Sequence, residues 1–225
     1  MPPFEYVLVR RRGRRGVGLK VDAKGLTVSA PLSMPLARIE AAVLENERWV
    51  VKKLAEWKDR RIPVIEWRDG AQLPYLGGYL TLKIETASRN RVELVNGTLH
   101  AAVRDMSPES IRRAVTAWYK RAALAHLGER TFTLARIAGL TPPRLVLSSA
   151  MARWGSCNTK REIRLTWRLV KARPALIDYV VCHELAHLRH MNHSRAFWSE
   201  VERQCPAYRE LRKELLATDH LYRAF

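Results

Sequence analysis

The chain has 225 residues, of which 47% are hydrophobic, and this is enough for one large domain or two small ones with an apolar core. It contains no apolar run of about eighteen residues and no basic-then-apolar leader, so we expect no membrane span and a cytoplasmic protein. The cysteines are odd in number and form no CxxC pair, which favours free thiols over a disulfide framework. They are Cys157, Cys182 and Cys205.

The sequence is strongly basic. Its 40 Lys and Arg residues oppose 22 Asp and Glu residues, which gives a net charge of +18 at pH 7. Such an excess favours anionic partners, so nucleic acid or a nucleotide is a candidate partner. The densest cluster is RRRGRR at Arg10 to Arg15, but an arginine-rich solvated surface explains the same composition, and no known base-reading signature is present.

The first part of the chain alternates between strand and helix patterns. Residues 4–31 hold two short alternating apolar runs separated by AKG, which predicts a β-hairpin. Residues 36–61 have apolar side chains at helical spacing without Gly or Pro, which predicts one long amphipathic helix. Strand patterns return over residues 63–103, with Asn-Gly as a tight-turn pair. We therefore expect residues 1–105 to form a β-rich N-terminal region that carries one helix.

Residues 106–225 have a mainly helical pattern with one short β-hairpin. The segment SPES supplies an N-cap and a proline at the first helical position, so a helix or a pair of helices is predicted from Ser107 to about Leu140. Two strand-like runs around a turn at residues 155–161 follow, and an apolar helical pattern begins after Pro174. The expected fold class is α+β, and since no long linker lies near residue 105, the two regions are expected to pack as one body.

A helix carrying the sequence HELAH is the strongest functional signal. His183 and His187 are four residues apart, so both imidazoles project from one helix face, about 6 Å apart along the axis, and can reach one ion. A zinc ion lowers the pKa of a bound water to about 7, and Glu184 can take that water's proton as general base. The hypothesis is zinc-dependent hydrolysis, although Ni²⁺, Co²⁺ or Cu²⁺ would also accept imidazole ligands.

The third metal ligand is predicted to be His193 rather than His190. On a continuous helix His190 would lie about 10 Å from His183 along the axis, which is too far for a compact site. Asn192 tolerates the left-handed conformation that ends many helices, so the chain can fold His193 back toward the ion.

Four further side chains are candidates for contacts with the substrate or the transition state: Arg153, Ser156, Asn158 and Tyr208. The arginine could bind a carboxylate bidentately, or instead hold Asp178 within the fold. The serine, the asparagine or the tyrosine could donate to a developing oxyanion. Glu200 and Glu202 on the next helix remain rival metal ligands, although both are expected to be solvated.

Three segments together resemble the YgjP-like family of zinc metallopeptidases, which is related to the SprT and WLM groups: MARWGSC, DYVVCHELAHL and NHSRAFW. The arginine-rich hairpin and the segments ERWVVKKL and YLGGYLTL resemble the same family. The resemblance implies a zincin-like catalytic region over residues 106–225, with zinc bound by His183, His187 and His193 and with Glu184 as base. We expect a peptide or protein substrate. SprT and WLM relatives act on proteins crosslinked to DNA, and the basic charge is compatible with such a role.

Three functions remain open at the level of sequence. The leading one is a zinc-dependent peptidase. The second is a metal-dependent phosphohydrolase acting on nucleotides, because zinc-bound water attacks phosphorus as well as acyl carbon, but the chain lacks an acidic Mg²⁺ cluster and a GxxxxGK loop. The third is a nucleic-acid-associated protein in which the basic hairpin binds and the metal is structural, and a steeply salt-dependent affinity would mark it.

Overall fold

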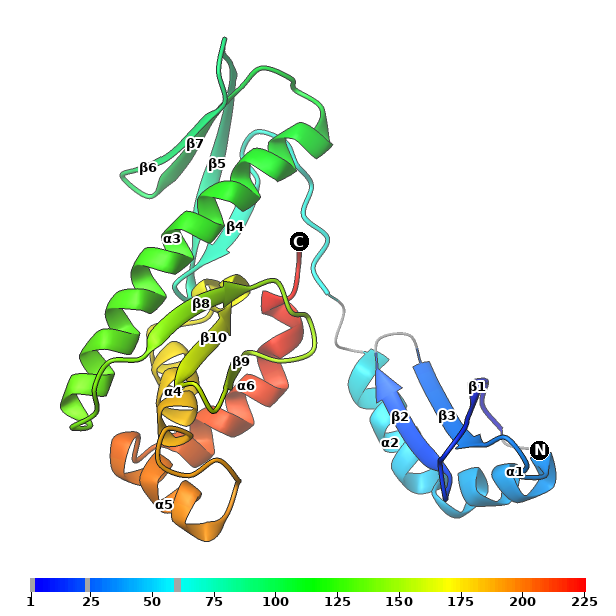
Figure 1. Cartoon of the computed structure of the whole chain (residues 1–225). Coiled ribbons are helices and arrows are strands. Elements are labelled where there is room, and N and C mark those ends of the chain that lie inside the picture. The colour runs from blue at the N-terminus through cyan, green and yellow to red at the C-terminus, as the bar shows by residue number, and fades with distance from the viewer. Residues whose placement is uncertain (1–2, 23–24, 59–61) are drawn as a thin grey trace. The chain divides into compact units, whose positions relative to one another are not determined.

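The computed structural model describes residues 3–22, 25–58 and 62–225. Its helices and mixed sheets confirm the α+β fold class. The chain divides into two compact units, Met1–Ile62 and Pro63–Phe225, and each is described by itself (Figure 1). The units therefore divide at residue 62 and not near residue 105, because the later strands of the expected N-terminal region pack on helices of the larger unit.

The N-terminal unit contains a three-stranded sheet and two helices. Its strands are β1 (Tyr6–Arg11), β2 (Gly18–Asp22) and β3 (Gly25–Pro31), in the order β1-β3-β2. β2 and β3 pair antiparallel, which confirms the predicted hairpin, whereas the turn residues Ala23 and Lys24 lie outside the described residues. β1 pairs parallel to β3, a partner that local alternation does not predict.

The expectation of one helix over residues 36–61 is wrong. The segment forms α1 (Leu36–Glu45) and α2 (Glu47–Lys58), and its last residues lie outside the described chain. Asn46 makes the break because its side-chain amide donates to the Ala42 carbonyl at 2.9 Å, in competition with the helical backbone. Both helices share an apolar core with the sheet, and its buried residues are Leu26, Val28, Ala30, Ile39, Val43 and Val50.

The larger unit begins with a four-stranded sheet of order β4-β5-β7-β6 (Figure 1). Its strands are β4 (Gln72–Tyr75), β5 (Gly78–Thr86), β6 (Arg91–Val95) and β7 (Thr98–Val103). β6 and β7 pair antiparallel through Asn96 and Gly97, both at positive φ, which confirms the predicted tight turn.

The tip of the β4–β5 hairpin is bonded to the chain that precedes the HELAH helix. The amide of Leu76 donates to the carbonyl of Val170 at 2.8 Å, and the amide of Gly77 donates to the carbonyl of Lys171 at 3.2 Å. Gly77 has a φ of 81°, and a Cβ at this position would lie 2.5 Å from the Cβ of Arg173. Only glycine fits this turn, which holds the sheet against the segment that leads to the site.

A helix of 30 residues, α3 (Pro108–Ile137), packs against strands of this sheet and against the HELAH helix. It begins as predicted: Ser107 is the N-cap, and its hydroxyl accepts a hydrogen bond from the amide of Ser110 at 3.4 Å. Pro108 takes the first helical position, where its missing N–H costs nothing.

A second, three-stranded sheet has the order β8-β10-β9. Its strands are β8 (Arg144–Ser148), β9 (Gly155–Cys157) and β10 (Glu162–Thr166). β9 pairs antiparallel with β10, which confirms the hairpin predicted around residues 155–161. β9 is an edge strand of the described sheet, and it contacts the HELAH helix.

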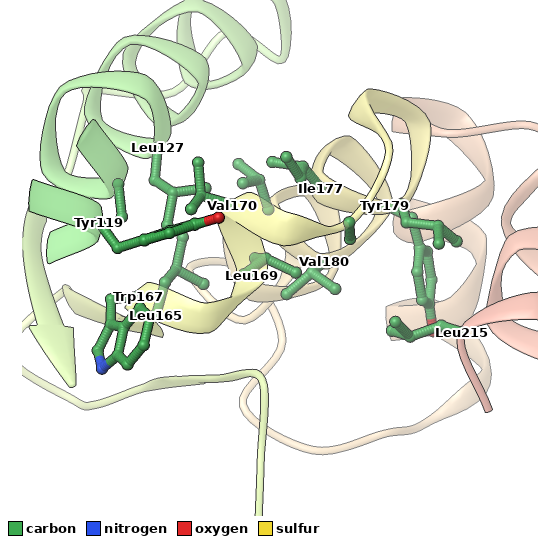
Figure 2. Packing of buried hydrophobic residues seen from close by; sticks show 14 of the residues in the cluster. Tyr119, Leu127, Leu165, Trp167, Leu169, Val170, Ile177, Tyr179, Val180 and Leu215 are labelled. Carbon is green, nitrogen blue, oxygen red and sulfur yellow. The ribbon is translucent and has the colours of Figure 1, made fainter. Parts of the chain in front are cut away.

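Three α-helices follow a 3-10 turn, η1 (Trp167–Lys171). They are α4 (Pro174–Ala186), α5 (Arg195–Gln204) and α6 (Tyr208–Tyr222). α4 packs against α3, α5, α6 and β9, and Figure 2 shows Ile177, Tyr179 and Val180 of this helix among buried side chains of its neighbours. The helix that carries HELAH is therefore central to the core. Among the described residues, no helix combines the length and apolarity needed to cross a membrane.

Candidate metal centre

α4 carries the first two histidines at its C-terminal end. His183 lies in the last turn, and His187 is the C-cap residue, still with helical backbone angles. The centroids of their rings are 5.2 Å apart. Because α4 is surrounded by other elements, His183 is half-buried and His187 is buried.

The chain leaves this helix earlier than the sequence suggests. α4 ends at Ala186, whose carbonyl accepts hydrogen bonds from the amides of Arg189 and His190 at 3.1 and 3.0 Å. Asn192 is not among the described non-glycine residues with positive φ, so the predicted left-handed helix end at this residue is wrong. The turn instead begins directly after His187, where no glycine or asparagine announces it.

His193 returns to the other two histidines because a new helix begins directly behind it. Ser194 is the N-cap of α5, and its hydroxyl accepts from the amide of Phe197 at 3.4 Å. Nε2 of His193 lies 3.2 Å from Nε2 of His183. One ring nitrogen from each of the three histidines lies within 4.8 Å of the others, so the fold brings together the three side chains that the sequence proposes as ligands.

These histidines fit a divalent transition metal such as zinc. Two nitrogens that each bind a tetrahedral zinc at about 2.1 Å are about 3.4 Å apart, close to the 3.2 Å between His183 and His193. Burial, together with the neighbouring His187 and His193, lowers the pKa of His183 to about 4, and burial lowers the pKa of His187. Both rings are therefore neutral near pH 7, which is the form that ligates a metal.

A backbone carbonyl orients the second histidine. Nδ1 of His187 lies 3.1 Å from the carbonyl oxygen of His190. When Nδ1–H donates to this oxygen, Nε2 of His187 is the nitrogen left to bind a metal. His190 thus acts through its main chain, and no pattern of side chains in the sequence reveals such a contact.

Phe197 and Trp198 of α5 pack on the histidines. Phe197 is fully buried, and its ring centroid lies 5.0, 4.5 and 4.7 Å from those of His183, His187 and His193. The Trp198 ring lies 5.7 Å from that of His183 and 5.9 Å from that of His193. α5 therefore positions the cluster together with α4. From the sequence alone, the helical spacing of Phe197 and Trp198 indicates only that both belong to the hydrophobic core.

Glu184, next to His183 on α4, is only 4% exposed. Burial raises its pKa to about 8, and the positive charge of Arg153 opposes this rise. Its Oε2 is buried without a hydrogen-bond partner among the described residues, so this oxygen is available to accept a proton. Gly155 of β9 packs on the same side chain, because a Cβ there would lie 2.6 Å from Oε1 of Glu184.

Arg153 is exposed on the loop before β9 and does not hold Asp178. Asp178 instead accepts two hydrogen bonds from Arg130 of α3, both at 2.8 Å. The alternative that Arg153 serves the fold through Asp178 is therefore wrong. Arg153 is two residues from Gly155, so its main chain lies close to the carboxyl of Glu184.

The two polar candidates on the β9–β10 hairpin have different surroundings. Ser156 lies within β9 and is half-buried. Asn158 is exposed, and its Oδ1 accepts hydrogen bonds from the amides of Lys160 and Glu162, both at 3.0 Å. The Oδ1 atom of Asn158 therefore shapes the turn. Only the side-chain NH2 group (Nδ2) is left to contact a substrate.

Tyr208 is buried at the start of α6. Its ring stacks on that of Trp198 with a centroid separation of 5.6 Å, and Nε of Arg209 lies 3.1 Å from its hydroxyl oxygen and donates to it. Through these contacts Tyr208 is linked to the histidines by the Trp198 ring, which stacks on Tyr208 and packs on His183. A direct role of the hydroxyl in the reaction stays a prediction.

The two acidic residues of α5, Glu200 and Glu202, differ in burial. The expectation that Glu200 is solvated is wrong: it is 8% exposed, and Arg203 and Gln204 each donate to its Oε1 at 2.7 Å. The hydrogen bond from Arg203 lowers the pKa of Glu200. Glu202 is exposed and pairs with Arg209 at 3.6 Å. In the part of the chain that the structure describes, the three histidines form the only cluster of metal-ligating side chains.

The cysteine thiols are unpaired, and their surroundings disfavour the thiolate. Cys157, Cys182 and Cys205 are free, which confirms the expectation of unpaired thiols. Burial raises the pKa of each thiol, that of Cys182 to about 12, so the reactive thiolate form is disfavoured.

Comparisons with known proteins yield one family and two solved structures. The family described as YgjP-like, metallopeptidase domain, matches residues 15–218. The metallopeptidase zymogen abylysin of Pyrococcus abyssi is 22% identical with a TM-score of 0.39, over 42% of this chain and 96% of that chain. The zymogen jannalysin of Methanocaldococcus jannaschii is 17% identical with a TM-score of 0.35, over 40% of this chain and 93% of that chain. None of the curated proteins matches.

Proposed function

Because the chain belongs to the YgjP-like metallopeptidase domain family, we propose that it cleaves peptide bonds with zinc bound by His183, His187 and His193 and with Glu184 as general base. Membership of the family makes it a metal-dependent hydrolase. The observation that supports the detailed proposal is the cluster itself. Three ring nitrogens lie within 4.8 Å of one another, next in sequence to a buried carboxyl whose Oε2 has no partner in the described chain.

Zinc, when bound, supplies a Lewis acid for the scissile carbonyl and lowers the pKa of a water. The other tasks belong to the chain's own residues. A positive charge held by three neutral imidazoles favours the carboxylate form of Glu184, whose pKa burial raises to about 8. In that form Oε2 accepts a proton from the attacking water and returns it to the leaving amine.

We infer that the peptide substrate lies along β9. This strand has β10 on one edge and no strand on its other edge in the described sheet. Gly155 of the same strand packs on Glu184, so an extended peptide added to the free edge would pass beside the general base and gain main-chain hydrogen bonds. The hydroxyl of Ser156 and the side-chain NH2 group of Asn158 are candidate donors to the developing oxyanion. The hydroxyl of Tyr208 is a third candidate, provided that it moves away from Arg209.

A nucleotide phosphohydrolase is the second candidate. It is favoured by the basic character of the chain, with a net charge of +18, and by the positive charge of Arg153 near Glu184. The same activated water and the same base would serve attack on phosphorus. Nucleic-acid association through the N-terminal cluster is the third, and it rests on the exposed side chains of Arg11, Arg12 and Arg15.

The test compares the zinc-loaded protein with its Glu184→Gln variant on a pool of unfolded proteins and peptides, with and without DNA. Glutamine has nearly the same shape but cannot accept the proton, so we expect cleavage to fall by about 10³-fold while zinc binding persists. Glu202→Gln, which changes an exposed acid of α5, is the matched control and should keep full activity.

The outcomes separate the candidates. Peptide cleavage that survives Glu184→Gln would refute the assigned base. Release of phosphate or pyrophosphate from nucleoside triphosphates that disappears in the variant would move the protein to the phosphohydrolase class. Stimulation of peptide cleavage by DNA would assign a role to the positive charge.

A further inference from the structure

An exposed arginine approaches the histidine cluster from α6. The guanidinium carbon of Arg212 lies 4.9 Å from the centroid of the Trp198 ring. That ring is 5.7 Å from the ring of His183 and 5.9 Å from the ring of His193. Arg212 is therefore one aromatic ring away from two of the three ligand candidates, and its side chain is open to solvent.

A second exposed arginine approaches from the loop before β9. Arg153 precedes Gly155 by two positions, and Gly155 is in van der Waals contact with Glu184. The two arginines come from segments far apart in the sequence, yet each is close to a different functional side chain. Arg153 lies near the general base, whereas Arg212 lies near the ligand candidates.

Neither arginine is neutralised by an acid in the described chain. The carboxylates of α4, α5 and α6 that form ion pairs do so with other arginines, and they are Asp178, Glu200, Glu202, Glu214 and Asp219. No described ion pair includes Arg153 or Arg212. In a chain with many arginines, exposure alone would mean little. What distinguishes these two is their place, on the segments that border Glu184 and the histidines.

We propose that Arg153 and Arg212 form an anion-recognition pair at the rim of the site, so that the preferred substrate carries a negatively charged group beside the bond that is cleaved. The proposal rests on the proposed hydrolytic function and names its substrate class. In a peptide the group is the carboxylate of Asp, Glu or the C-terminus. A phosphate presents the same kind of acceptor oxygens, and guanidinium binds both groups through paired hydrogen bonds.

The first experiment uses pairs of peptides that differ only by Glu or Gln at positions flanking the cleaved bond, or by a free or amidated C-terminus. We expect the wild type to cleave the charged member about tenfold more efficiently, as fits a charged hydrogen bond. In Arg153→Gln and Arg212→Gln this ratio, which compares two peptides cleaved by the same variant, should fall toward one. Arg121→Gln removes the same charge from an exposed position of α3 and should preserve the ratio.

The second experiment measures binding without turnover. N-acetylglutamate, N-acetylglutamine and inorganic phosphate are titrated by calorimetry into the zinc-loaded wild type and the three variants at fixed ionic strength. We expect the anions to bind more weakly, by about tenfold, to Arg153→Gln and Arg212→Gln than to the wild type and Arg121→Gln. Zinc itself attracts anions, but that contribution is common to all four proteins.

These readouts separate this inference from the proposed function. If no peptide is cleaved but anion binding still depends on both arginines, the peptidase proposal fails and the recognition pair stands. If phosphate binding alone depends on them, the recognised group is a phosphate. If the wild type shows no charge preference, or if both arginine variants keep the wild-type preference and affinity, the pair is refuted.

Discussion

At the scale of single residues, the position of the Glu184 carboxyl depends on the absence of a side chain at Gly155. The carboxyl is buried, its Oε2 has no described partner, and the glycine of β9 closes against its Cγ and Oε1. A side chain at position 155 would therefore occupy the space that the carboxyl of Glu184, the proposed base, fills. The glycine in RWGSC is therefore required by this contact.

Gly155→Ala should inactivate the enzyme without removing its metal. The new Cβ would lie 2.6 Å from Oε1 of Glu184, so the carboxyl must shift, and misplacement of a base by about 1 Å can cost about 10²-fold in kcat/KM. Zinc affinity, measured by competition with a chelator, should be unchanged. Gly128→Ala in α3 is the control, because a Cβ there meets nothing within 4 Å. Full activity in Gly155→Ala would show that the contact is not needed.

The metal-free protein should lose stability as pH rises through the pKa of Glu184. The folded pKa of about 8 exceeds the ordinary 4.5, so between these values the folded state binds more protons than the unfolded state. The contribution of the neutral carboxyl is fully present below about pH 4.5 and is lost as pH rises to about 8, by roughly 1.4 kcal/mol per unit of pKa difference.

Glu184→Gln isolates this effect because glutamine does not titrate, whereas the histidines titrate equally in both proteins. In chelator, the unfolding free energy of the variant minus that of the wild type should be near zero at about pH 4.5 and reach several kcal/mol at about pH 9. Urea unfolding at several pH values measures this difference. A difference that does not change with pH would mean that Glu184 is not strongly shifted.

Some of these residues were accessible to sequence reasoning and others were not. His183, Glu184 and His187 share one stretch of helix, so fixed helical geometry predicts their relation. The carbonyl of His190 and the ring of Phe197 reach the site only because the chain turns after Ala186, and no turn residue marks that position. The prediction that His193 comes near His183 agrees with the structure, but the reason given, a left-handed Asn192, does not.

At the scale of elements, helix starts were easier to predict than helix ends. Ser107 and Pro108 mark the start of α3 through side-chain chemistry that is local in sequence. The break at Asn46 depends on a competition between a side chain and the backbone, and the end of α4 at Ala186 is marked by no glycine or asparagine. Neither is visible as a change in composition.

The junction between α3 and α4 can be tested through its ion pair. Arg130 binds Asp178 bidentately, and the two side chains are 32% and 29% exposed. Arg130→Met leaves the carboxylate unpaired and should lower the unfolding free energy by about 1–3 kcal/mol, measured in urea. Adding Asp178→Asn should recover part of the loss.

The control for this pair is Arg112→Met on the same helix. Arg112 pairs with Glu109 at the surface, with side chains 46% and 58% exposed, so its loss should change stability by less than about 0.5 kcal/mol. Equal effects of the two substitutions would show that the α3–α4 ion pair does not stabilise the junction.

At the scale of the whole molecule, the sequence predicted the fold class but not the grouping of its parts. A β-rich segment followed by a helical one suggests a division where the composition changes, near residue 105. The compact units instead divide at residue 62, because the four-stranded sheet packs on α3 and η1. Contacts between segments far apart in sequence set this grouping, and alternation within each strand carries no information about them.

The bonded tip of the β4–β5 hairpin has a consequence for how such a site can be inherited. The amides of Leu76 and Gly77 satisfy the carbonyls of Val170 and Lys171, and the hydroxyl of Tyr119 donates to the Pro74 carbonyl at 2.7 Å. A protein that carried α4 without this hairpin would leave the carbonyls of the buried residues Val170 and Lys171 without these partners. Transfer of the metal helix to another scaffold therefore requires the sheet that seats it, as a block that begins near Pro63.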